Sequence, residues 1–360
     1  MQIRWIIETD ATPVRALATG HYLFDRVRDE GAPVILYGAS IKGDALVLGR
    51  HQRADDAVHA TALEDRGLRA IRRQSGGPAA MLGRGIVYVA LCLRHGSVLT
   101  DCPRDRLLNR NVRGVLGGLA LTGLQAHYFG RQWISVSRRP AGLVGWDRND
   151  GAVLLEFFIG ASRNFAPDPA LIGYPEPKEA PFGGKEPIQL TEAWEEEKPV
   201  TELIRAIAEG HLDRFEGELE LDQSSLSDEE REAAKDCEAS TFVVGGDLAE
   251  AFLESEDVES TLPGRPPMVW SRPREIPIGF VSGGIRLDDD DRIEGARIAG
   301  DFYCDREAIG ILSDRLQGQE PKKKIIAQAL ESTFDGNSYV LEGIKDLAPV
   351  VDALAEAGKR

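Results

Sequence analysis

Residues 72–80 read RRQSGGPAA: two arginines, a serine and a glycine pair that lead into small residues just before an apolar run. Glycine lets the backbone approach a ligand closely, and successive N–H groups beside guanidinium groups can hold an anion. The stretch therefore predicts an anion-binding loop. The alternative for Arg72 and Arg73 is an exposed strand end. The alternative for Gly76 and Gly77 is a tight turn, which Pro78 favours because proline lacks an N–H. The candidate ligand residues are Arg72, Arg73, Ser75, Gly76 and Gly77.

The segments around this loop alternate between strand and helix patterns. Apolar residues at helical spacing predict helices over 13–30, 104–124 and 199–215, and a polar helix is expected over about 54–66. Short apolar runs bounded by turn residues predict strands over 33–38, 44–50, 85–93, 131–137 and 152–160, with a turn over 138–151. Residues 164–199 are rich in Pro, Gly and Glu and read as a loop. Ser227, ahead of Asp-Glu-Glu, suits a helix N-cap.

The end of the chain reads as a separate unit. Residues 283–302 predict a hairpin around the acidic turn DDDD, and a helix over 306–318 and two shorter helices follow. The acidic run lacks the spacing of a calcium loop, so a solvated turn is the preferred interpretation. We expect a large unit over 1–245, a linker over 246–272 and a smaller unit over 273–360. The fold class is α+β, with a mixed sheet, flanking helices and a smaller α+β C-terminal unit.

Charge and composition exclude several classes of protein. The 360 residues carry a formal net charge of −16, which argues against non-specific nucleic-acid binding because phosphate contacts need a surplus of Lys and Arg. No apolar stretch approaches the 18 or so residues that a membrane helix requires. The start, MQIRWIIETD, acquires charge too soon for a secretory signal. A cytoplasmic protein that binds neither membrane nor nucleic acid is the expectation.

Cysteine and histidine spacing does not suggest a metal centre. The four cysteines form no CxxC pair, and the six histidines form no HxxxH or HExxH motif. We therefore predict no protein-bound metal. His21 lies on the apolar stripe of the first helix and is expected to be a packed histidine. His51 is either a pocket residue or a half-exposed strand end.

The order of several motifs resembles the lipoate–protein ligase A family, within the biotin/lipoate ligase superfamily. LVLGRHQ is close to the family's strand ending in Gly-Arg-x-Gln, and RAIRRQSGG matches its Arg-Arg-x-Ser/Thr-Gly-Gly. RRPAG stands where the family has a Lys-x-x-Gly turn. IEGARIAGDFY and LSDRLQG are similar to the family's accessory domain. The resemblance covers nearly the whole chain and implies a ligase-like domain over 1–245 and an accessory domain over 273–360.

Enzymes of that family activate a fatty-acid-like carboxylate with ATP and transfer the acyl group to a carrier-protein lysine. The resemblance implies ATP and Mg²⁺ as cofactors, lipoate or a related medium-chain acid as substrate, and a lipoyl carrier domain of a 2-oxoacid dehydrogenase or glycine-cleavage type protein as partner. It implies that the 72–77 loop surrounds the acyl-adenylate. Arg139 would be the catalytic cation in place of the family lysine, and Gly142 the turn glycine, although a surface arginine is the equal alternative for Arg139.

The chain also departs from the family's motif set. The third loop glycine is Pro78, and Arg139 replaces the lysine with a cation of different shape and hydration. Further departures are Leu82, Gly83, Ile86, Gln132, Trp133 and the run Leu154 to Glu156. Two hypotheses follow: an ATP-dependent ligase with reduced activity, or a catalytically degenerate ligase fold that binds an acyl group or a carrier protein. Because no cysteine lies between Cys102 and Cys237, transfer through a cysteine thioester is disfavoured.

Overall fold

The protein is described by a computed structural model that covers residues 1–129, 132–149, 151–178, 181–194, 198–215, 217–240, 243–244, 267–335 and 339–359. Most of the linker predicted over 246–272 lies outside the described residues, so the predicted unit boundaries remain a prediction. The mixed sheet with flanking helices and the additional sheet-rich C-terminal region confirm the predicted fold class.

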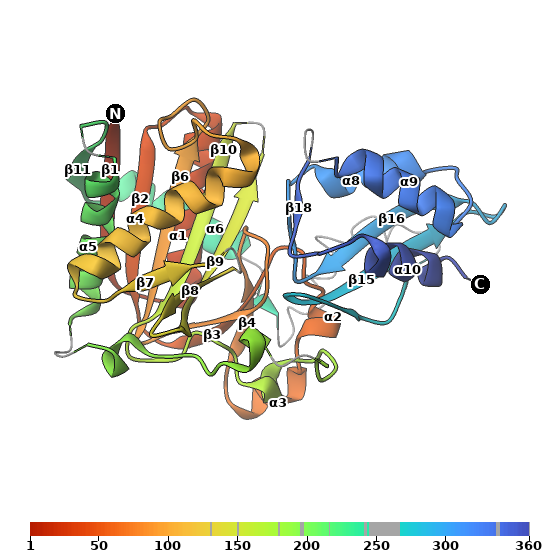
Figure 1. Cartoon of the computed structure of the whole chain (residues 1–360), viewed down its shortest axis with the longest axis horizontal. Coiled ribbons are helices and arrows are strands. Elements are labelled where there is room, and N and C mark those ends of the chain that lie inside the picture. Colours follow the sequence, from red (N-terminus) through yellow and green to blue (C-terminus); the bar gives the residue numbers. More distant parts are fainter. Residues whose placement is uncertain are drawn as a thin grey trace.

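An eight-stranded mixed sheet forms the centre of the larger part (Figure 1). Its order is β11-β1-β2-β6-β10-β9-β8-β7. β1 runs parallel to both β11 and β2, and the remaining pairs are antiparallel. The strands are β1 (Gln2–Ala11), β2 (Val34–Ile41), β6 (Ile86–Arg94), β7 (Ala126–Tyr128), β8 (Trp133–Val136), β9 (Arg139–Arg148), β10 (Ala152–Gly160) and β11 (Glu220–Ser224).

Helices cover both faces of this sheet because its strands are apolar on both sides. α1 (Pro13–Asp29) and α6 (Asp228–Ser240) lie on one face, and α4 (Leu107–Leu121) and α5 (Val200–Arg214) on the other (Figure 1). Thr12 caps the start of α1, since its hydroxyl accepts the N–H of Arg15, and Pro13 occupies the first turn of the helix. Ser227 caps α6 as predicted, since its hydroxyl accepts the N–H of Glu230 at 3.1 Å.

A second, four-stranded sheet carries the RRQSGG segment. Its order is β12-β4-β3-β5. The bounds are β3 (Asp44–Leu48), β4 (Arg69–Arg72), β5 (Ala80–Gly83) and β12 (Val243–Val244). The helix predicted over 54–66 is wrong as a single element: α2 (Ala54–Ala57) and α3 (Ala60–Asp65) are separated by Val58, which forms an isolated bridge with Ile172.

The C-terminal part contains a further antiparallel sheet and three helices, and these include the predicted hairpin and the three predicted helices. β15 (Gly279–Leu287) pairs with β13 (Val269–Trp270), β14 (Arg274–Ile276) and β16 (Ile293–Gly300). The predicted acidic turn joins β15 to β16, and the short β17 (Tyr303–Cys304) pairs with β18 (Leu341–Glu342). The helices are α8 (Ala308–Leu316), α9 (Lys323–Thr333) and α10 (Ala348–Ala357).

Two sequence-based expectations are corrected by the structure. Residues 139–148, predicted within a turn because of their Gly and Pro content, form the central strand β9. Gly142 and Gly145 fit in this strand because a Cβ at either position would overlap a close neighbour, the Phe158 carbonyl or the Ser75 hydroxyl. The apolar side chains between the two glycines are buried. β1 was not predicted, although its apolar side chains enter the cores on both faces of the sheet.

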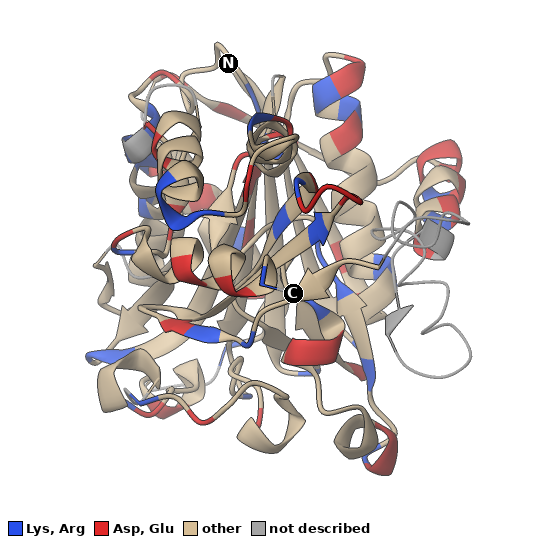
Figure 2. Ribbon diagram, turned by 90° about the vertical axis from the view of Figure 1, so that its right-hand side faces the viewer, with Lys and Arg blue, Asp and Glu red and all other residues tan. Residues whose placement is uncertain are grey.

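None of the described helices is long and apolar enough to cross a membrane. Basic and acidic residues are interspersed along the ribbon in Figure 2 rather than segregated by sign.

Candidate functional site

The predicted anion loop lies between β4 and β5, against the α1 face of the large sheet. Gly145 of β9 approaches Ser75 so closely that a Cβ at residue 145 would overlap the Ser75 hydroxyl. Ser75 and Arg73 are buried, with 0% and 1% of their surfaces exposed. The loop is therefore an internal feature of the fold, and the alternative of an exposed strand end is wrong for these residues.

Acceptors of the chain itself meet the backbone donors of this loop. The Ser75 N–H donates to Glu156 Oε2 at 3.0 Å. The Gly76 N–H donates to the Trp146 carbonyl at 3.0 Å, and the Gly77 N–H to the Phe302 carbonyl at 2.9 Å. The other oxygen of Glu156 accepts the Tyr88 hydroxyl at 2.6 Å. The side chain of Glu156 thus occupies a loop N–H group that was predicted to bind an external anion.

The two loop arginines are directed inward. Arg72 Nη1 donates to the carbonyls of Gly49, Arg50 and Gln52 at 2.9, 2.8 and 2.5 Å, which holds the preceding turn. Arg73 donates through Nε to the Ser75 hydroxyl at 2.9 Å, and through Nη2 to the carbonyls of Gly76 and Pro78, both at 2.8 Å.

The remaining guanidinium nitrogen of Arg73 is different. Nη1 is buried and has no hydrogen-bond partner among the described residues. Burial lowers the pKa of Arg73, and the opposing charge of Glu156 does not fully offset this effect. A buried cation with an unused donor is costly unless an acceptor reaches it.

Arg139 and Gly142 lie apart from the loop. Arg139 is the first residue of β9 and lies six positions before Gly145, which contacts Ser75. At about 3.3 Å per residue that is roughly 20 Å of strand. The Arg139 side chain donates to the carbonyls of Glu186 and Pro187 and pairs with Glu192 at 2.9 Å. Gly142, expected in a turn, lies inside β9 opposite Ile159.

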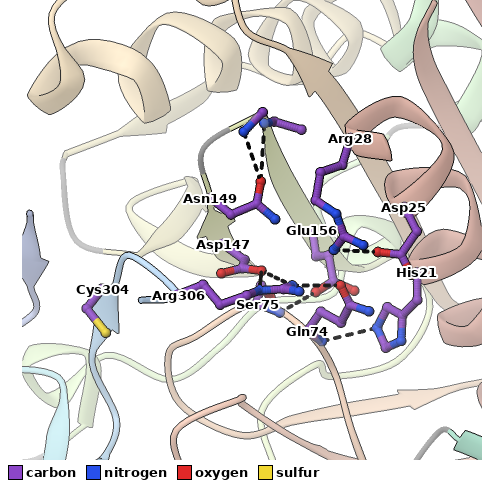
Figure 3. Close-up of polar contacts among 12 residues, drawn as sticks. His21, Asp25, Arg28, Gln74, Ser75, Asp147, Asn149, Glu156, Cys304 and Arg306 are labelled. Atoms are coloured by element: carbon purple, nitrogen blue, oxygen red, sulfur yellow. Dashed lines mark hydrogen bonds and ion pairs between the residues drawn. The ribbon is translucent and has the colours of Figure 1, made fainter. Parts of the chain in front are cut away.

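A polar cluster adjoins the loop instead (Figure 3). Arg306 donates through Nη2 to Gln74 Oε1 at 2.9 Å and through Nε to Asp147 Oδ2 at 3.0 Å. The Gln74 N–H donates to His21 Nε2 at 3.1 Å. Burial, followed by the charges of Arg306 and Arg50, lowers the pKa of His21 to about 3. His21 is therefore packed, as predicted, and neutral, but it also fixes the loop.

The most deeply buried partner of Arg306 in this cluster is the carboxylate of Asp147. Only 1% of Asp147 is exposed, and its Oδ1 has no hydrogen-bond partner among the described residues. Asp147 follows Gly145 by two positions on β9, so both face the loop side of the sheet. Sequence reasoning missed Asp147 because residues 138–151 were assigned to a turn. The signal that could have found it is the alternation along GLVGWD once a strand is assumed.

His51, in the turn after β3, contacts two residues of the C-terminal part. His51 Nε2 and Cys304 Sγ lie 3.4 Å apart, and the His51 ring stacks on Phe302 with ring centroids 4.9 Å apart. Burial raises the pKa of Cys304 well above its usual range, so the group is a thiol. His51 thus forms a contact between the two parts of the chain, and it is half-exposed in the turn that follows β3, as the alternative expectation had it.

Several positions that depart from the family motifs are core residues here. Leu82, Ile86 and Leu154 are fully buried in the apolar cluster that α1 covers. Trp133 packs edge-on against Phe182 with ring centroids 5.4 Å apart. The three buried aliphatic side chains stabilise the fold by burial and offer no polar group to a ligand, whereas Trp133 is half-buried.

No three His, Cys, Asp or Glu side chains in the described part of the chain come together as a metal site. Near the loop, the carboxylate oxygens of Glu156 are both occupied, and Asp147 Oδ2 is paired with Arg306. The donors present do not fit a Mg²⁺ cage made by the protein, because such a site needs several converging oxygens.

Comparison with known proteins agrees with this architecture. Residues 12–151 match the family model described as the lipoyl protein ligase A/B catalytic domain. LipL1 of P. falciparum, solved with lipoate, is similar in structure with a TM-score of 0.66 at 13% identity, covering 99% of this chain and 98% of its own. A bipartite lipoate protein ligase of Thermoplasma acidophilum was solved as part of a lipoylation system with its E2 lipoyl domain. Its TM-score is 0.54 at 16% identity, and the match covers 66% of this chain and 92% of the ligase chain.

A lipoate-protein ligase A bound with ATP gives a TM-score of 0.54 at 14% identity, with 66% of this chain and 95% of its own covered. No curated protein matches the chain. The resemblance expected from the motifs is confirmed to this extent: residues 12–151 match the lipoyl protein ligase A/B catalytic domain model, and the chain shares its fold with these lipoate-protein ligase structures.

Proposed function

We propose that the protein is a lipoate–protein ligase-type enzyme of the cytoplasm. It activates lipoate or a related medium-chain acid with ATP and transfers the acyl group to a lysine of a lipoyl carrier domain. The family match and fold support the class of reaction. The carrier is a domain of the 2-oxoacid dehydrogenase or glycine-cleavage type, in line with the Thermoplasma acidophilum ligase and its E2 lipoyl domain.

The observation that carries the proposal is the buried Nη1 of Arg73, which has no hydrogen-bond partner within the described part of the chain. Arg73 is 1% exposed and its three other hydrogen bonds all go to atoms of its own loop. A phosphate or acyl oxygen is the acceptor that a buried guanidinium beside a Ser-Gly-Gly turn would take. Arg73 is therefore the proposed contact to the adenylate, with Arg72, Ser75, Gly76 and Gly77 shaping the loop around it.

Ligand binding must then compete with contacts of the chain itself. An adenylate that uses the Gly77 N–H displaces the Phe302 carbonyl, and one that uses the Ser75 N–H displaces Glu156. We propose that this competition lowers the affinity for the adenylate and hence the activity. Arg139 takes the family's cation role in this proposal only if the start of β9 approaches the loop.

ATP would supply the activating phosphoanhydride, as in the similar ligase solved with ATP. Mg²⁺ would arrive bound to the phosphates of ATP, because the chain offers no cage of its own.

The test is a transfer assay on the full chain. Purified protein is incubated with lipoate, ATP, Mg²⁺ and a lipoyl domain that carries its acceptor lysine, and the domain is weighed by mass spectrometry. Lipoylated domain that requires ATP and the protein supports the proposal, and Arg73→Gln abolishes it. Arg139→Lys, which restores the family residue, raises the rate if residue 139 acts as the cation. A domain that stays unmodified contradicts the proposal.

The second candidate is a catalytically degenerate ligase fold that binds an acyl group or a carrier protein. The observation that favours it is that the N–H groups of Ser75, Gly76 and Gly77 all donate to acceptors of the chain itself. Binding of the lipoyl domain without any modification of it supports this second function.

A further inference from the structure

Two carboxylates flank the loop on neighbouring strands of the large sheet, and they differ in one respect. Glu156 on β10 is fully buried, and each of its oxygens accepts a hydrogen bond. Asp147 on β9 is equally buried, but only its Oδ2 is paired, with Arg306. Its Oδ1 has no partner among the described residues. A buried carboxylate oxygen without a donor is costly, so the site is built for a donor that the chain does not supply.

The cluster around Asp147 reaches the surface. The Asp25 and Arg28 side chains, on the exposed end of α1, are 38% and 25% exposed, and that of Arg306 is 22% exposed. Figure 3 shows these groups arranged around Gln74, with Asp147 beside Arg306. The buried Asp147 carboxylate thus lies next to a side chain, that of Arg306, which is itself partly exposed.

His21 lies beside this place and is neutral, because burial and the charges of Arg306 and Arg50 lower its pKa to about 3 against the opposing charge of Asp147. An alkylamine that attacks here must likewise be neutral, because only the neutral form has a nucleophilic lone pair.

We propose that Asp147 Oδ1 is the acceptor for the attacking amine of the carrier lysine: it binds the amine N–H and takes up the proton released on attack. This inference rests on the proposed function and names a catalytic residue for its second step. The nitrogen lone pair forms the new C–N bond with the acyl carbon of the adenylate. The bond from that carbon to the phosphate oxygen breaks, and AMP leaves with the electron pair. The amine proton passes to Asp147 and from there to solvent.

Arg306 has a positioning part in this arrangement. It ties Asp147 Oδ2 to Gln74 of the loop, so that the free oxygen is directed away from the ion pair. The backbone N–H of Arg306 also donates to the Arg148 carbonyl at 2.9 Å, which fixes the turn before α8 to β9. The C-terminal part thereby sets the position of the amine acceptor.

The experiment separates the amine step from adenylate binding. The full chain is mixed with chemically prepared lipoyl-adenylate and propylamine, a mimic of the lysine side chain, and formation of the propyl amide is followed in a single turnover. The Kd of a non-hydrolysable lipoyl-adenylate mimic is measured by calorimetry in parallel. Asp147→Asn is compared with wild type and with Asp290→Asn, a control in the exposed turn before β16.

We expect Asp147→Asn to lower amide formation on the order of 100-fold and to leave the Kd of the mimic unchanged, while Asp290→Asn matches wild type in both. Asp147→Ala provides a second arm: formate, which can occupy the vacated space beside Arg306, restores amide formation in this variant. Rescue by formate is not expected of a residue that only stabilises the fold.

Two results overturn the inference and leave the proposed function intact. In the first, Asp147→Asn forms amide at the wild-type rate. In the second, Asp147→Asn loses mimic binding and rate together, and formate does not rescue Asp147→Ala. A wild type that binds the mimic and does not accelerate amide formation overturns the inference together with the transfer step of the proposed function, and favours the second candidate function. If wild type does not bind the mimic at all, the proposed function itself fails and the inference fails with it.

Discussion

Gln52 and Asp301 connect the two parts of the chain through a buried hydrogen bond: Gln52 Nε2 donates to Asp301 Oδ1 at 2.6 Å. The other oxygen, Oδ2, accepts the Phe280 N–H at 2.8 Å. Gln52 belongs to the Gly-Arg-His-Gln segment beside the loop, and Asp301 follows the hairpin of the C-terminal part. Burial raises the pKa of Asp301 to about 7 in spite of these two donors.

A dependence of stability on pH follows from that shift. In the unfolded chain Asp301 ionises near its ordinary pKa of 3.8, whereas in the folded chain it stays protonated up to about 7. The folded state therefore binds more protons between these values, and its stability falls as the pH rises from about 4 through 7, by up to about 4 kcal/mol. Urea unfolding at pH 5 and pH 8 measures this, and Asp301→Asn is expected to remove most of the decline. An equal decline in Asp301→Asn would contradict the assignment to this group.

Gly77 provides a test of how tightly the loop is closed. Its φ is +94°, and a Cβ there would overlap the Tyr303 hydroxyl. Gly123 has a similar φ of +88°, with nothing within 4 Å of an added Cβ. Gly123→Ala should cost about 1–2 kcal/mol from backbone strain alone. Gly77→Ala should cost about 2–5 kcal/mol, since overpacking adds to the strain.

The difference between these two variants in urea unfolding isolates the contact with Tyr303. Equal costs for Gly77→Ala and Gly123→Ala would mean that the C-terminal part does not press on the loop as described.

Glu230 is expected to stabilise the contact of α6 with β1 and α1. Its pKa is lowered to about 2, first by the hydrogen bond from Arg4 and then by the Ser227 N–H and the charges of Arg4 and Arg26. The stabilisation is present above the ordinary pKa of 4.5 and is lost as the pH falls toward 2. At pH 7 Glu230→Gln should reduce the free energy of unfolding by about 1.5–3 kcal/mol.

The matched control is Glu232→Gln, on an exposed position of the same helix. It should change the free energy of unfolding by less than about 0.5 kcal/mol. A cost of Glu230→Gln that does not shrink between pH 7 and pH 3 would argue against the ion pair with Arg4.

Much of the fold was predictable from local patterns. The apolar spacing over 13–30 and the Thr12-Pro13 start locate α1, and Ser227 locates the start of α6. The hairpin around the acidic turn is likewise local. β9 was not predictable in the same way, because the Gly and Pro residues that give room for Ser75 and Phe158 look like turn residues in the sequence alone.

The candidate site was predictable only in part. The motif indicates the loop, but which groups meet it depends on contacts between distant segments, such as Gly77 with Phe302 and Gln74 with Arg306. The separation of Arg139 from the loop follows from the length of β9, which was expected to be a turn. Asp147 could be recognised only once its strand and its unpaired oxygen were known.

The central claim, that Arg73 of the loop meets an acyl-adenylate, is tested most directly by calorimetric titration of the full chain with a non-hydrolysable lipoyl-adenylate mimic. Arg73→Gln is compared with Arg139→Gln, an arginine that is held away from the loop by Glu186, Pro187 and Glu192. The account predicts saturable binding to wild type, its loss in Arg73→Gln and its retention in Arg139→Gln. Equal binding by wild type and a folded Arg73→Gln variant, or no binding to wild type, would contradict it.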